Sequence, residues 1–413
     1  MELTREGIKN QEAWQEKGYE LPAYDIEKIA EQTKKHPYWI HFGAGNLFRA
    51  FHAGIAQKLL NDGITECGVI VAEGFDEELI GNIYDSHDNL AISAVLKADG
   101  TIRKEVIAGI AEALALDAGN KEAFERLKTV FSEDSLQMAT FTITEKGYAL
   151  RDGNGELLPE AAKDFKAGPD APESYMGKIA ALLHARYRSG KKPIAMVSTD
   201  NCSHNGEKLY DAVVAFAEAW VKNHRAEPEF LSYIKSELVS FPWSMIDKIT
   251  PRPDETVRQL LETDGVRGLD TVVTAKHTYA APFVNSEKTG YLVIEDDFPN
   301  GRIPLEAGGI LLTDRKTVDQ VEKMKVCTCL NPLHTGLAIF GCLLGFTTIS
   351  DEMADPDLAR FARILGEKEG LPVVASQKIL DPKEFLETVL TVRLPNPFLP
   401  DTPQRIATDT SQK

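Results

Sequence analysis

The sequence predicts an α/β protein in which a parallel sheet with helices on both faces is followed by a mostly α-helical C-terminal part. Two observations lead to this fold class. Short, wholly apolar segments alternate with amphipathic helical patterns as far as about residue 300, which is typical of a parallel sheet. Beyond that point the spacing of apolar residues is helical. The length of 413 residues also exceeds one typical hydrophobic core, so we expect two domains.

Four strands and four helices are predicted in the N-terminal part. Each strand is a short apolar run, and the four runs cover residues 38–42, 67–72, 138–143 and 193–198. The helices carry apolar residues at helical spacing and cover residues 26–35, 46–60, 175–188 and 209–222. Pro37 ends the first helix, the pair Asp62-Gly63 ends the second, and a turn is expected at 144–148.

The C-terminal part is predicted to be helical over residues 318–345, 358–368 and 382–392. The polar segment 296–302, which contains a proline and a glycine, follows a strand-like run and is the expected junction. We therefore predict a sheet domain over residues 1–300 and a mostly helical domain over residues 301–413.

Composition and charge exclude several classes of protein. With 46 basic and 63 acidic residues the formal net charge is −17, which disfavours nonspecific binding to nucleic acid or to anionic membranes. The N-terminus lacks the apolar core of a signal peptide, and the longest apolar run, at 336–346, is too short to span a bilayer. Five cysteines are an odd and sparse set for a disulfide framework. We expect a cytoplasmic protein with reduced thiols and no membrane or nucleic-acid partner.

A glycine turn follows the first predicted strand. The order strand, Gly43-Ala44-Gly45 and helix places free N–H groups and the positive end of a helix dipole where a pyrophosphate binds. This geometry predicts a Rossmann-type dinucleotide site. The third glycine of the usual fingerprint is absent, and Phe48 takes its place. A tight strand–helix turn without a ligand is the alternative interpretation of the same residues.

The second predicted strand leads into Glu73, in the position where a carboxylate binds the ribose hydroxyls of NAD and repels the extra phosphate of NADP. Asp76 is a second candidate for this role, and a solvated carboxylate at a strand end is the alternative. The expected cofactor is therefore NAD. The predicted cofactor-binding residues are Gly43, Gly45, Asn46, Phe48, Glu73 and Asn201.

A lysine, an asparagine and a histidine gather at the entry to an apolar helix, at Lys325, Asn331 and His334. Hydride transfer to a ketone needs a group that trades a proton with the carbonyl oxygen and donors that hold that oxygen as charge develops. A lysine with a lowered pKa suits the first task, and an amide and an imidazole N–H suit the second. Each residue also has a structural interpretation, as a solvated helix lysine, an N-cap before Pro332 and a core histidine.

Blocks of sequence, in the same order across nearly the whole chain, resemble the long-chain polyol dehydrogenase family, which includes mannitol 2-dehydrogenase and the fructuronate and tagaturonate reductases. The blocks are GAGNLFRAFHAG (43–54), TITEKGY (142–148), STDNCSHNG (198–206), FPWSMIDKITP (241–251), VIEDDFPNGR (293–302), the cluster at 325–334, and RIATDTSQK (405–413). The resemblance implies a Rossmann-type N-terminal domain, a mostly helical C-terminal domain and an active site between them. It also implies metal-independent, NAD-linked interconversion of a linear polyol or sugar acid with its keto form.

The resemblance also implies roles for single residues. Asn331 and His334 match the N-x-x-H pair that holds the oxyanion, and Lys325 is the lysine placed to match the general acid/base. The residues implied to contact the substrate are Asn201, in the S-x-D-N motif, and Arg405 and Lys413 near the chain end. The chain stops at Lys413, inside a motif after which family members usually continue, so we expect either a shortened member or an incomplete sequence.

The spacing of the lysine departs from the family pattern. Lys325 lies six residues before Asn331, whereas the usual spacing is five. In an unbroken helix one extra residue rotates a side chain by about 100°. Pro332 removes a backbone hydrogen bond and crowds the turn before it, so we expect a break or bulge at 329–331 that absorbs the added residue.

The predicted function is NAD-dependent interconversion of a keto-sugar acid such as fructuronate and an aldonate such as mannonate. The basic pair Arg405 and Lys413 favours a sugar acid over a neutral polyol. Mannitol-type 2-dehydrogenation and tagaturonate reduction are the alternatives within the family. An epimerase that retains NAD and a non-catalytic NAD-binding module are alternatives from other classes. A monomer or homodimer is the family expectation.

A zinc site is a further alternative, with Cys327, Cys329 and His334 as ligands together with Cys202 and His204 from the other domain. The spacing does not match a Cys-x-x-Cys motif, and two thiols two residues apart on a helix point about 200° apart. We therefore expect no metal.

Overall fold

The computed structural model describes residues 1–97, 99–375, 377–399 and 401–408. Its largest sheet has six parallel strands in the order β6-β3-β2-β7-β8-β9. These strands are β2 (Trp39–Phe42), β3 (Val69–Glu73), β6 (Ile110–Ala115), β7 (Met138–Phe141), β8 (Ile194–Ser198) and β9 (Val239–Ser240). The direction of strand addition reverses between β2 and β7, which opens a crevice at the carboxyl ends of these two strands. The order is that of a Rossmann-type sheet and confirms the predicted N-terminal fold.

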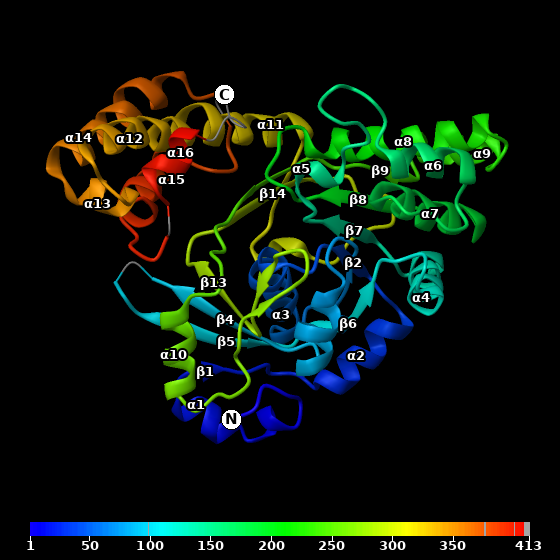
Figure 1. Ribbon diagram of the computed structural model, residues 1–413, viewed down its shortest axis with the longest axis horizontal. Helices are drawn as coiled ribbons and strands as arrows, with labels where there is room; N and C mark the ends of the chain where they lie inside the picture. The colour runs from blue at the N-terminus through cyan, green and yellow to red at the C-terminus, as the bar shows by residue number, and fades with distance from the viewer. Residues whose placement is uncertain (98, 376, 400, 409–413) are drawn as a thin grey trace.

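Helices cover both faces of this sheet (Figure 1). The helix that follows β2 packs on one face and consists of a π-helical turn, η2 (Phe48–His52), and α3 (Ala53–Asn61). The opposite face packs against α4 (Lys121–Ser132), α7 (Tyr175–Arg188), α8 (Asn205–Lys222) and α9 (Pro228–Ile234). The helices α2 (Ile26–Lys35) and α7 have their predicted bounds. The helix predicted over 209–222 begins earlier, because its first turn is polar and lacks apolar spacing.

A second sheet of four strands, β1-β5-β4-β13, lies against η2 and α3. Its strands are β1 (Tyr19–Glu20), β5 (Ile102–Ile107), β4 (Ala91–Leu96) and β13 (Phe283–Glu287). Its far face packs against α1 (Gln11–Glu16) and α10 (Glu255–Thr263) through a separate apolar cluster. The sequence patterns above do not predict this sheet, because β5 is rich in charged residues and β-propensity depends strongly on context.

Shorter elements connect the sheets. A three-stranded sheet contains β10 (Ser244–Asp247), β14 (Tyr291–Glu295) and β15 (Leu311–Thr313). The pairing of β14 with β15 continues across the expected junction at 296–302, so the division at residue 300 stays a prediction. The turn expected at 144–148 is a short helix, α5 (Thr144–Gly147). The remaining short elements are α6 (Pro159–Ala167) and the paired strands β11 (Val272–Val273) and β12 (Tyr279–Ala280).

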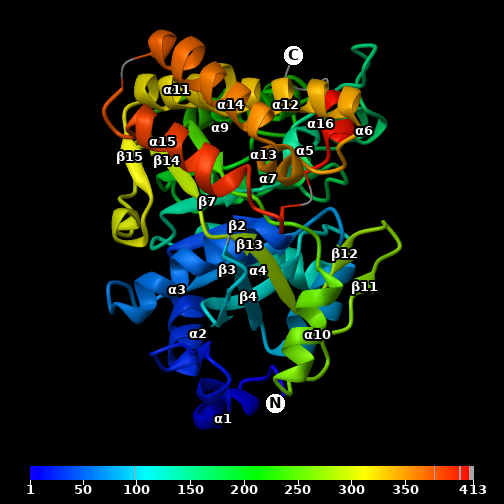
Figure 2. The same cartoon turned by 90° about the vertical axis from the view of Figure 1, so that its left-hand side faces the viewer.

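The C-terminal helices gather on one side of the molecule (Figures 1 and 2). They are α11 (Arg315–Lys323), α12 (Asn331–Leu344), α13 (Ile349–Ala354), α14 (Pro356–Ile364), α15 (Pro382–Thr388) and α16 (Pro403–Thr408). They pack around an apolar core of their own, which includes Val321, Leu333, Leu337 and Phe385. This part confirms the predicted helical C-terminal region. The helix expected over 318–345 is interrupted, because a π-helical segment, η6 (Met324–Cys329), separates α11 from α12.

The helical stretch Arg315–Leu344 is long and apolar enough, by length and composition, to cross a membrane. It is longer than the apolar run at 336–346 because it includes α11 and η6. The core helix of a soluble protein passes the same test. The Lys325 side chain, within this stretch, donates hydrogen bonds to Asn201 and to the Ile246 carbonyl of the sheet region. In its most apolar part 33% of the residues are buried, and at Lys325 the stretch is held against the sheet region.

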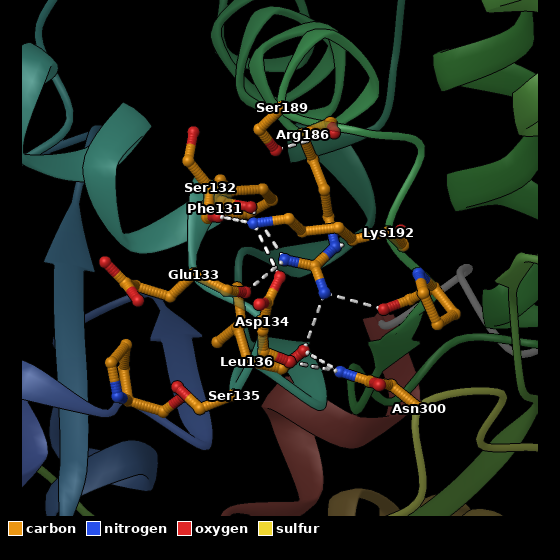
Figure 3. A network of polar contacts seen from close by, with 12 residues as sticks. Phe131, Ser132, Glu133, Asp134, Ser135, Leu136, Arg186, Ser189, Lys192 and Asn300 are labelled. Carbon is orange, nitrogen blue, oxygen red and sulfur yellow. Dashed lines mark hydrogen bonds and ion pairs between the residues drawn. The ribbon is translucent and has the colours of Figure 1, made fainter.

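A buried arginine ties together the amino ends of two central strands (Figure 3). The Arg186 guanidinium, on α7, is fully buried and donates five hydrogen bonds to backbone carbonyls. The acceptors are the carbonyl oxygens of Phe131, Glu133, Leu136, Lys192 and Pro193, at 2.7–3.1 Å. They belong to the end of α4 and to the segments that lead into β7 and β8. Burial lowers the pKa of Arg186 to about 10, so the side chain is charged at neutral pH.

Replacement of this arginine is expected to destabilise the fold. In Arg186→Met five buried hydrogen bonds are lost, although Leu136 and Lys192 keep a second donor in Asn300 and Tyr233. The expected loss is about 3–5 kcal/mol of unfolding free energy. Urea unfolding monitored by circular dichroism measures it. Arg188→Met is the matched control, because Arg188 is exposed on the same helix and pairs with Glu227. An equal loss in both variants would contradict the assignment.

Candidate active site between the sheet and the C-terminal helices

The glycine turn lies at the carboxyl end of β2, beside the crevice. Gly43 has a φ of +107°, and a Cβ at this position would lie 2.3 Å from the Thr142 carbonyl oxygen. Only glycine permits this close approach of the two strand ends. A Cβ at Gly45 would meet nothing within 4 Å, so the backbone there faces open space. A cavity of about 560 Å³ lies at this turn and is lined by both glycines, Glu73 and Asp76.

This cavity fits the predicted dinucleotide. The glycine turn leads directly into a helix, whose first N–H groups favour an anion such as a pyrophosphate. The rest of the wall is largely apolar, with Leu79, Ile143 and Leu158 among its residues, and offers a surface for a flat base. An approach of the backbone to a bound phosphate requires that position 45 carry no side chain.

The Glu73 carboxylate holds the glycine turn in place. One oxygen accepts the Ala44 N–H at 2.7 Å. The other oxygen accepts the N–H groups of Phe75 and Asp76 at 2.7 and 3.0 Å. Asp76 itself accepts a hydrogen bond from the Thr274 hydroxyl at 2.6 Å. Both acidic side chains therefore have structural partners, and a contact of Glu73 with ribose hydroxyls stays a prediction.

Three other residues predicted to bind the cofactor lie outside the lining of this cavity, and one of them, Asn201, lines the second cavity described below. Phe48 is fully buried, and its ring stacks on His41 with the centroids 4.5 Å apart. It fills the space between β2 and the following helix, where the usual third glycine would allow closer packing. The Asn46 amide oxygen accepts a hydrogen bond from the Arg49 guanidinium at 2.8 Å. Contacts of Phe48 and Asn46 with a cofactor stay predictions.

A second cavity, of about 510 Å³, is lined by residues at the carboxyl edge of the sheets and by residues of the C-terminal helices. It brings together five of the residues predicted for catalysis and substrate binding: Asn201, Lys325, Asn331, His334 and Arg405. These residues come from positions more than 200 apart in the chain. Lys413, the sixth, lies outside the described residues. The reaction cavity, as we call this space, also has Asp247, Arg393 and Asp401 in its wall.

The Lys325 side chain is buried at the wall of the reaction cavity, with 5% of its surface exposed. Its ammonium donates to the Asn201 amide oxygen at 2.7 Å and to the Ile246 carbonyl at 2.8 Å. The Asp247 carboxylate lies 3.7 Å from the same nitrogen. Burial lowers the pKa of Lys325, while Asp247 opposes this shift, and the net direction is downward. A downward shift makes the neutral amine more accessible than in a free lysine.

The extra residue between Lys325 and Asn331 is absorbed by the π-helical segment η6. Its hydrogen bonds run from residue i to i+5, as from the Leu330 N–H to the Lys325 carbonyl at 3.2 Å. The helix then breaks at Leu330, with φ −131° and ψ −66°, and α12 begins at Asn331. The irregularity begins somewhat earlier than the expected segment 329–331. Its effect is the expected one, because Lys325 and Asn331 line the same cavity.

The other predicted residues of the cavity lie on two helices, Asn331 and His334 on α12 and Arg405 on α16. Burial lowers the pKa of His334, so its imidazole is neutral at neutral pH and carries one N–H donor. The His334 Nε2 atom lies 3.9 Å from an Asp401 oxygen. The Arg405 guanidinium donates to the other Asp401 oxygen and is largely exposed. One carboxylate thus lies beside both a candidate oxyanion donor and a candidate substrate-binding cation.

The loop that carries Asn201 is braced by its neighbour Asp200. The Asp200 carboxylate accepts the N–H groups of Ile143 and Thr144 at 3.0 and 2.7 Å, and the Tyr148 hydroxyl at 2.5 Å. These bonds join the loops that follow β7 and β8. The motif blocks at 142–148 and 198–206 are therefore neighbours in space, and sequence reasoning assigned no role to Asp200 or Tyr148.

Sequence reasoning also missed a buried charge cluster in the wall of the cavity, formed by Asp247, Glu287 and Arg393. The Arg393 guanidinium donates to both carboxylates. Asp247 lies within the motif block at 241–251, and this position could have marked it as a candidate site residue. Nothing in the local sequence around Glu287 or Arg393 indicates that they meet.

The residues of the zinc alternative are dispersed. Cys327 is exposed and Cys329 is buried, and the His204 ring stacks on Trp243 with centroids 4.2 Å apart. Within the part of the chain that the structure describes, no three His, Cys, Asp or Glu side chains form a group that could hold a metal ion.

Comparison with known proteins identifies two domains. Residues 38–307 match the mannitol dehydrogenase Rossmann domain, and residues 317–413 match the mannitol dehydrogenase C-terminal domain. A protein named D-mannonate oxidoreductase from Thermotoga maritima is 51% identical over 415 aligned positions, which cover 100% of this chain and 76% of that protein. A D-mannonate oxidoreductase from Escherichia coli is 28% identical, over 95% of this chain and 75% of its own length.

Among solved structures, the Pseudomonas fluorescens mannitol 2-dehydrogenase in ternary complex with NAD and D-mannitol superimposes with a TM-score of 0.78 at 26% identity. The match covers 100% of this chain and 77% of that one. The two domain matches together account for most of the sequence. The chain therefore belongs to the mannitol dehydrogenase family of oxidoreductases.

Proposed function

We propose that this chain is a NAD-dependent oxidoreductase that interconverts D-mannonate with the corresponding keto-sugar acid, fructuronate, and that Lys325 is its general acid/base. The observation that carries the chemistry is the buried Lys325 amine in a cavity shared with Asn331 and His334. The 51% identity to a D-mannonate oxidoreductase supports the choice of a sugar acid over a neutral polyol.

The cofactor is proposed to bind in the crevice at the glycine turn. The backbone at Gly45 and the start of the following helix would hold the pyrophosphate, and the Glu73 carboxylate would disfavour a 2′-phosphate through its charge. NAD supplies the hydride acceptor for oxidation of the alcohol and, as NADH, the hydride donor for reduction of the ketone. All other steps fall to side chains of this chain.

Lys325 is proposed to exchange the proton of the substrate hydroxyl. An ammonium has three N–H groups, and the contacts to Asn201 and Ile246 use two of them. The third position on the nitrogen faces the substrate. In the ammonium it carries the proton that is given to the ketone oxygen, and in the amine it carries the lone pair that takes the proton from the alcohol. The two hydrogen bonds fix the nitrogen in place, so this exchange needs no rearrangement of the side chain.

Asn331 and His334 are proposed to donate hydrogen bonds to the same substrate oxygen, because an amide NH₂ and a neutral imidazole both offer a donor. Asn201 would position the substrate from the sheet side. Arg405 and Lys413 would bind hydroxyls or the carboxylate of the sugar acid. Arg405 is paired with Asp401 in this structure, so an acidic substrate would compete with that carboxylate.

Several broader features complete the proposal. We propose a cytoplasmic, metal-independent enzyme with a small-molecule sugar acid as its partner, and with neither nucleic acid nor membrane bound. It would act as a monomer or a homodimer. Mannitol-type dehydrogenation and tagaturonate reduction are the competing activities within the family, and a NAD-retaining epimerase is the competing activity outside it.

A substrate panel tests the proposed activity. With NAD present, D-mannonate is expected to give stoichiometric NADH with a kcat/KM at least tenfold above those for D-mannitol and D-altronate, because only an acid of the right stereochemistry meets both the cationic side chains and the lysine. NADH absorbance is the readout. A preference for mannitol or altronate would replace the proposed substrate, and turnover without net NADH would indicate the epimerase.

The role of the lysine is tested by Lys325→Met. Loss of the acid/base is expected to lower kcat by about 10²–10⁴-fold, while binding of NAD, measured by calorimetry, stays close to that of the wild type. Lys323→Met is the matched control, because Lys323 is exposed in the same helical stretch and pairs with Asp319. Near wild-type turnover in Lys325→Met would exclude the proposed role.

The direction of the Lys325 pKa shift predicts the pH dependence. Alcohol oxidation requires the neutral amine, so its kcat/KM is expected to rise with pH and to level off above a pKa below 10.5. Ketone reduction requires the ammonium, so its kcat/KM is expected to fall above that pKa. Initial rates in both directions across a pH series provide the test. An oxidation rate that is flat, or that falls as pH rises through this range, would contradict the assignment.

A further inference from the structure

Three buried charged side chains form a cluster with the amine of Lys325. The Arg393 guanidinium donates to Glu287 through Nε at 3.1 Å and through one terminal nitrogen at 2.8 Å. Its other terminal nitrogen donates to one oxygen of Asp247. The second Asp247 oxygen lies 3.7 Å from Lys325 Nζ. Each of the four residues is at most 5% exposed.

The cluster joins three parts of the fold. Asp247 is the last residue of β10, Glu287 is the last residue of β13, and Arg393 ends the π-helical segment η9 (Val389–Arg393) that follows α15. A guanidinium is planar and rigid, so contacts to two carboxylates fix the orientation of both. Arg393 thereby determines which Asp247 oxygen faces the lysine.

The charges of the cluster depend on the protonation of Lys325. Asp247 and Glu287 carry two negative charges, and Arg393 carries one positive charge. The cluster is therefore neutral when Lys325 is an ammonium and carries one net negative charge when Lys325 is an amine. A further cation, Lys248, donates to the Glu287 carbonyl, and burial lowers its pKa to about 8. Without Arg393, the two buried carboxylates would still favour the charged form of Lys325. The positive charge of Arg393 offsets one carboxylate and so allows Lys325 to become a neutral amine.

The other groups around the amine do not replace this effect. Asn201 and the Ile246 carbonyl are uncharged. His334, on α12, is neutral because burial lowers its pKa. Glu322, one turn earlier in the same helical stretch, raises the pKa of Lys325, and so does Asp247. Burial and the positive charge of Arg393 lower the pKa of Lys325.

We propose that Arg393 is a positioning residue for the acid/base lysine: it orients the Asp247 carboxylate and offsets the charge of that carboxylate, so that Lys325 can cycle between ammonium and amine. This inference rests on the proposed function of Lys325 and goes beyond it. Arg393 acts through its two carboxylate partners, and its guanidinium has all three donor edges engaged by them.

The test compares the pH profiles of three variants in alcohol oxidation. Arg393→Gln removes the cation, so the apparent pKa of kcat/KM is expected to rise by about one pH unit or more. Arg393→Lys keeps a positive charge, so its apparent pKa is expected to stay close to that of the wild type even if kcat falls. Asp247→Asn removes an anion, so its apparent pKa is expected to fall below that of the wild type.

These opposite shifts separate charge balance from damage to the fold. A purely structural role would lower kcat or the melting temperature of all three variants and leave their apparent pKa values equal, and that result would overturn the proposal. If Arg393→Gln does not fold, Arg393→Lys and Asp247→Asn still test the proposal. An apparent pKa of Asp247→Asn that does not fall below that of the wild type would also overturn the proposal. Failure of the proposed function is recognised separately, by a wild type without turnover or by an active Lys325→Met.

Discussion

The two hydrogen bonds donated by the Lys325 amine connect the two parts of the molecule. One acceptor, Asn201, follows the fifth strand of the parallel sheet, and the other is the Ile246 carbonyl on β10. Burial destabilises the charged form of a lysine. Here two hydrogen bonds and the nearby Asp247 carboxylate compensate the charge at the same nitrogen. The reaction cavity exists where these contacts hold the C-terminal helices against the sheets.

This constraint explains the irregular helix that carries the lysine. A regular α-helix from Arg315 to Leu344 would turn either Lys325 or Asn331 away from the cavity, because the two are six residues apart. The π-helical segment η6 adds a residue to one turn, and Leu330 leaves helical geometry before α12 begins. Bulges of this kind are frequent at functional sites. The proline after Asn331 fits the first turn of a new helix, where its missing N–H has no partner to lose.

Residues with a local signature were the ones that the sequence could predict. The strand, glycine turn and helix near Gly43 follow from apolar runs and backbone sterics, and the parallel sheet follows from their repetition. The reaction-cavity residues Asn201, Lys325 and His334 were found through motif blocks. The charge cluster of Asp247, Glu287 and Arg393 was missed, because its members are at least 40 residues apart in sequence. In the sequence alone each of them resembles an ordinary surface charge. The four-stranded sheet was missed because its charged strand gains its apolar face only from tertiary contacts.

The proposed chemistry requires that the Lys325 amine contact the substrate oxygen at which the proton is exchanged. A crystal structure with NADH and D-mannonate, a pair that cannot react, tests it most directly. We expect one substrate hydroxyl oxygen within about 2.6–3.2 Å of Lys325 Nζ, on the carbon that faces the nicotinamide, with Asn331 and His334 donating to the same oxygen. A bound mannonate whose nearest hydroxyl lies beyond about 4 Å from that nitrogen, with the lysine still engaged only by Asn201 and Ile246, would contradict it.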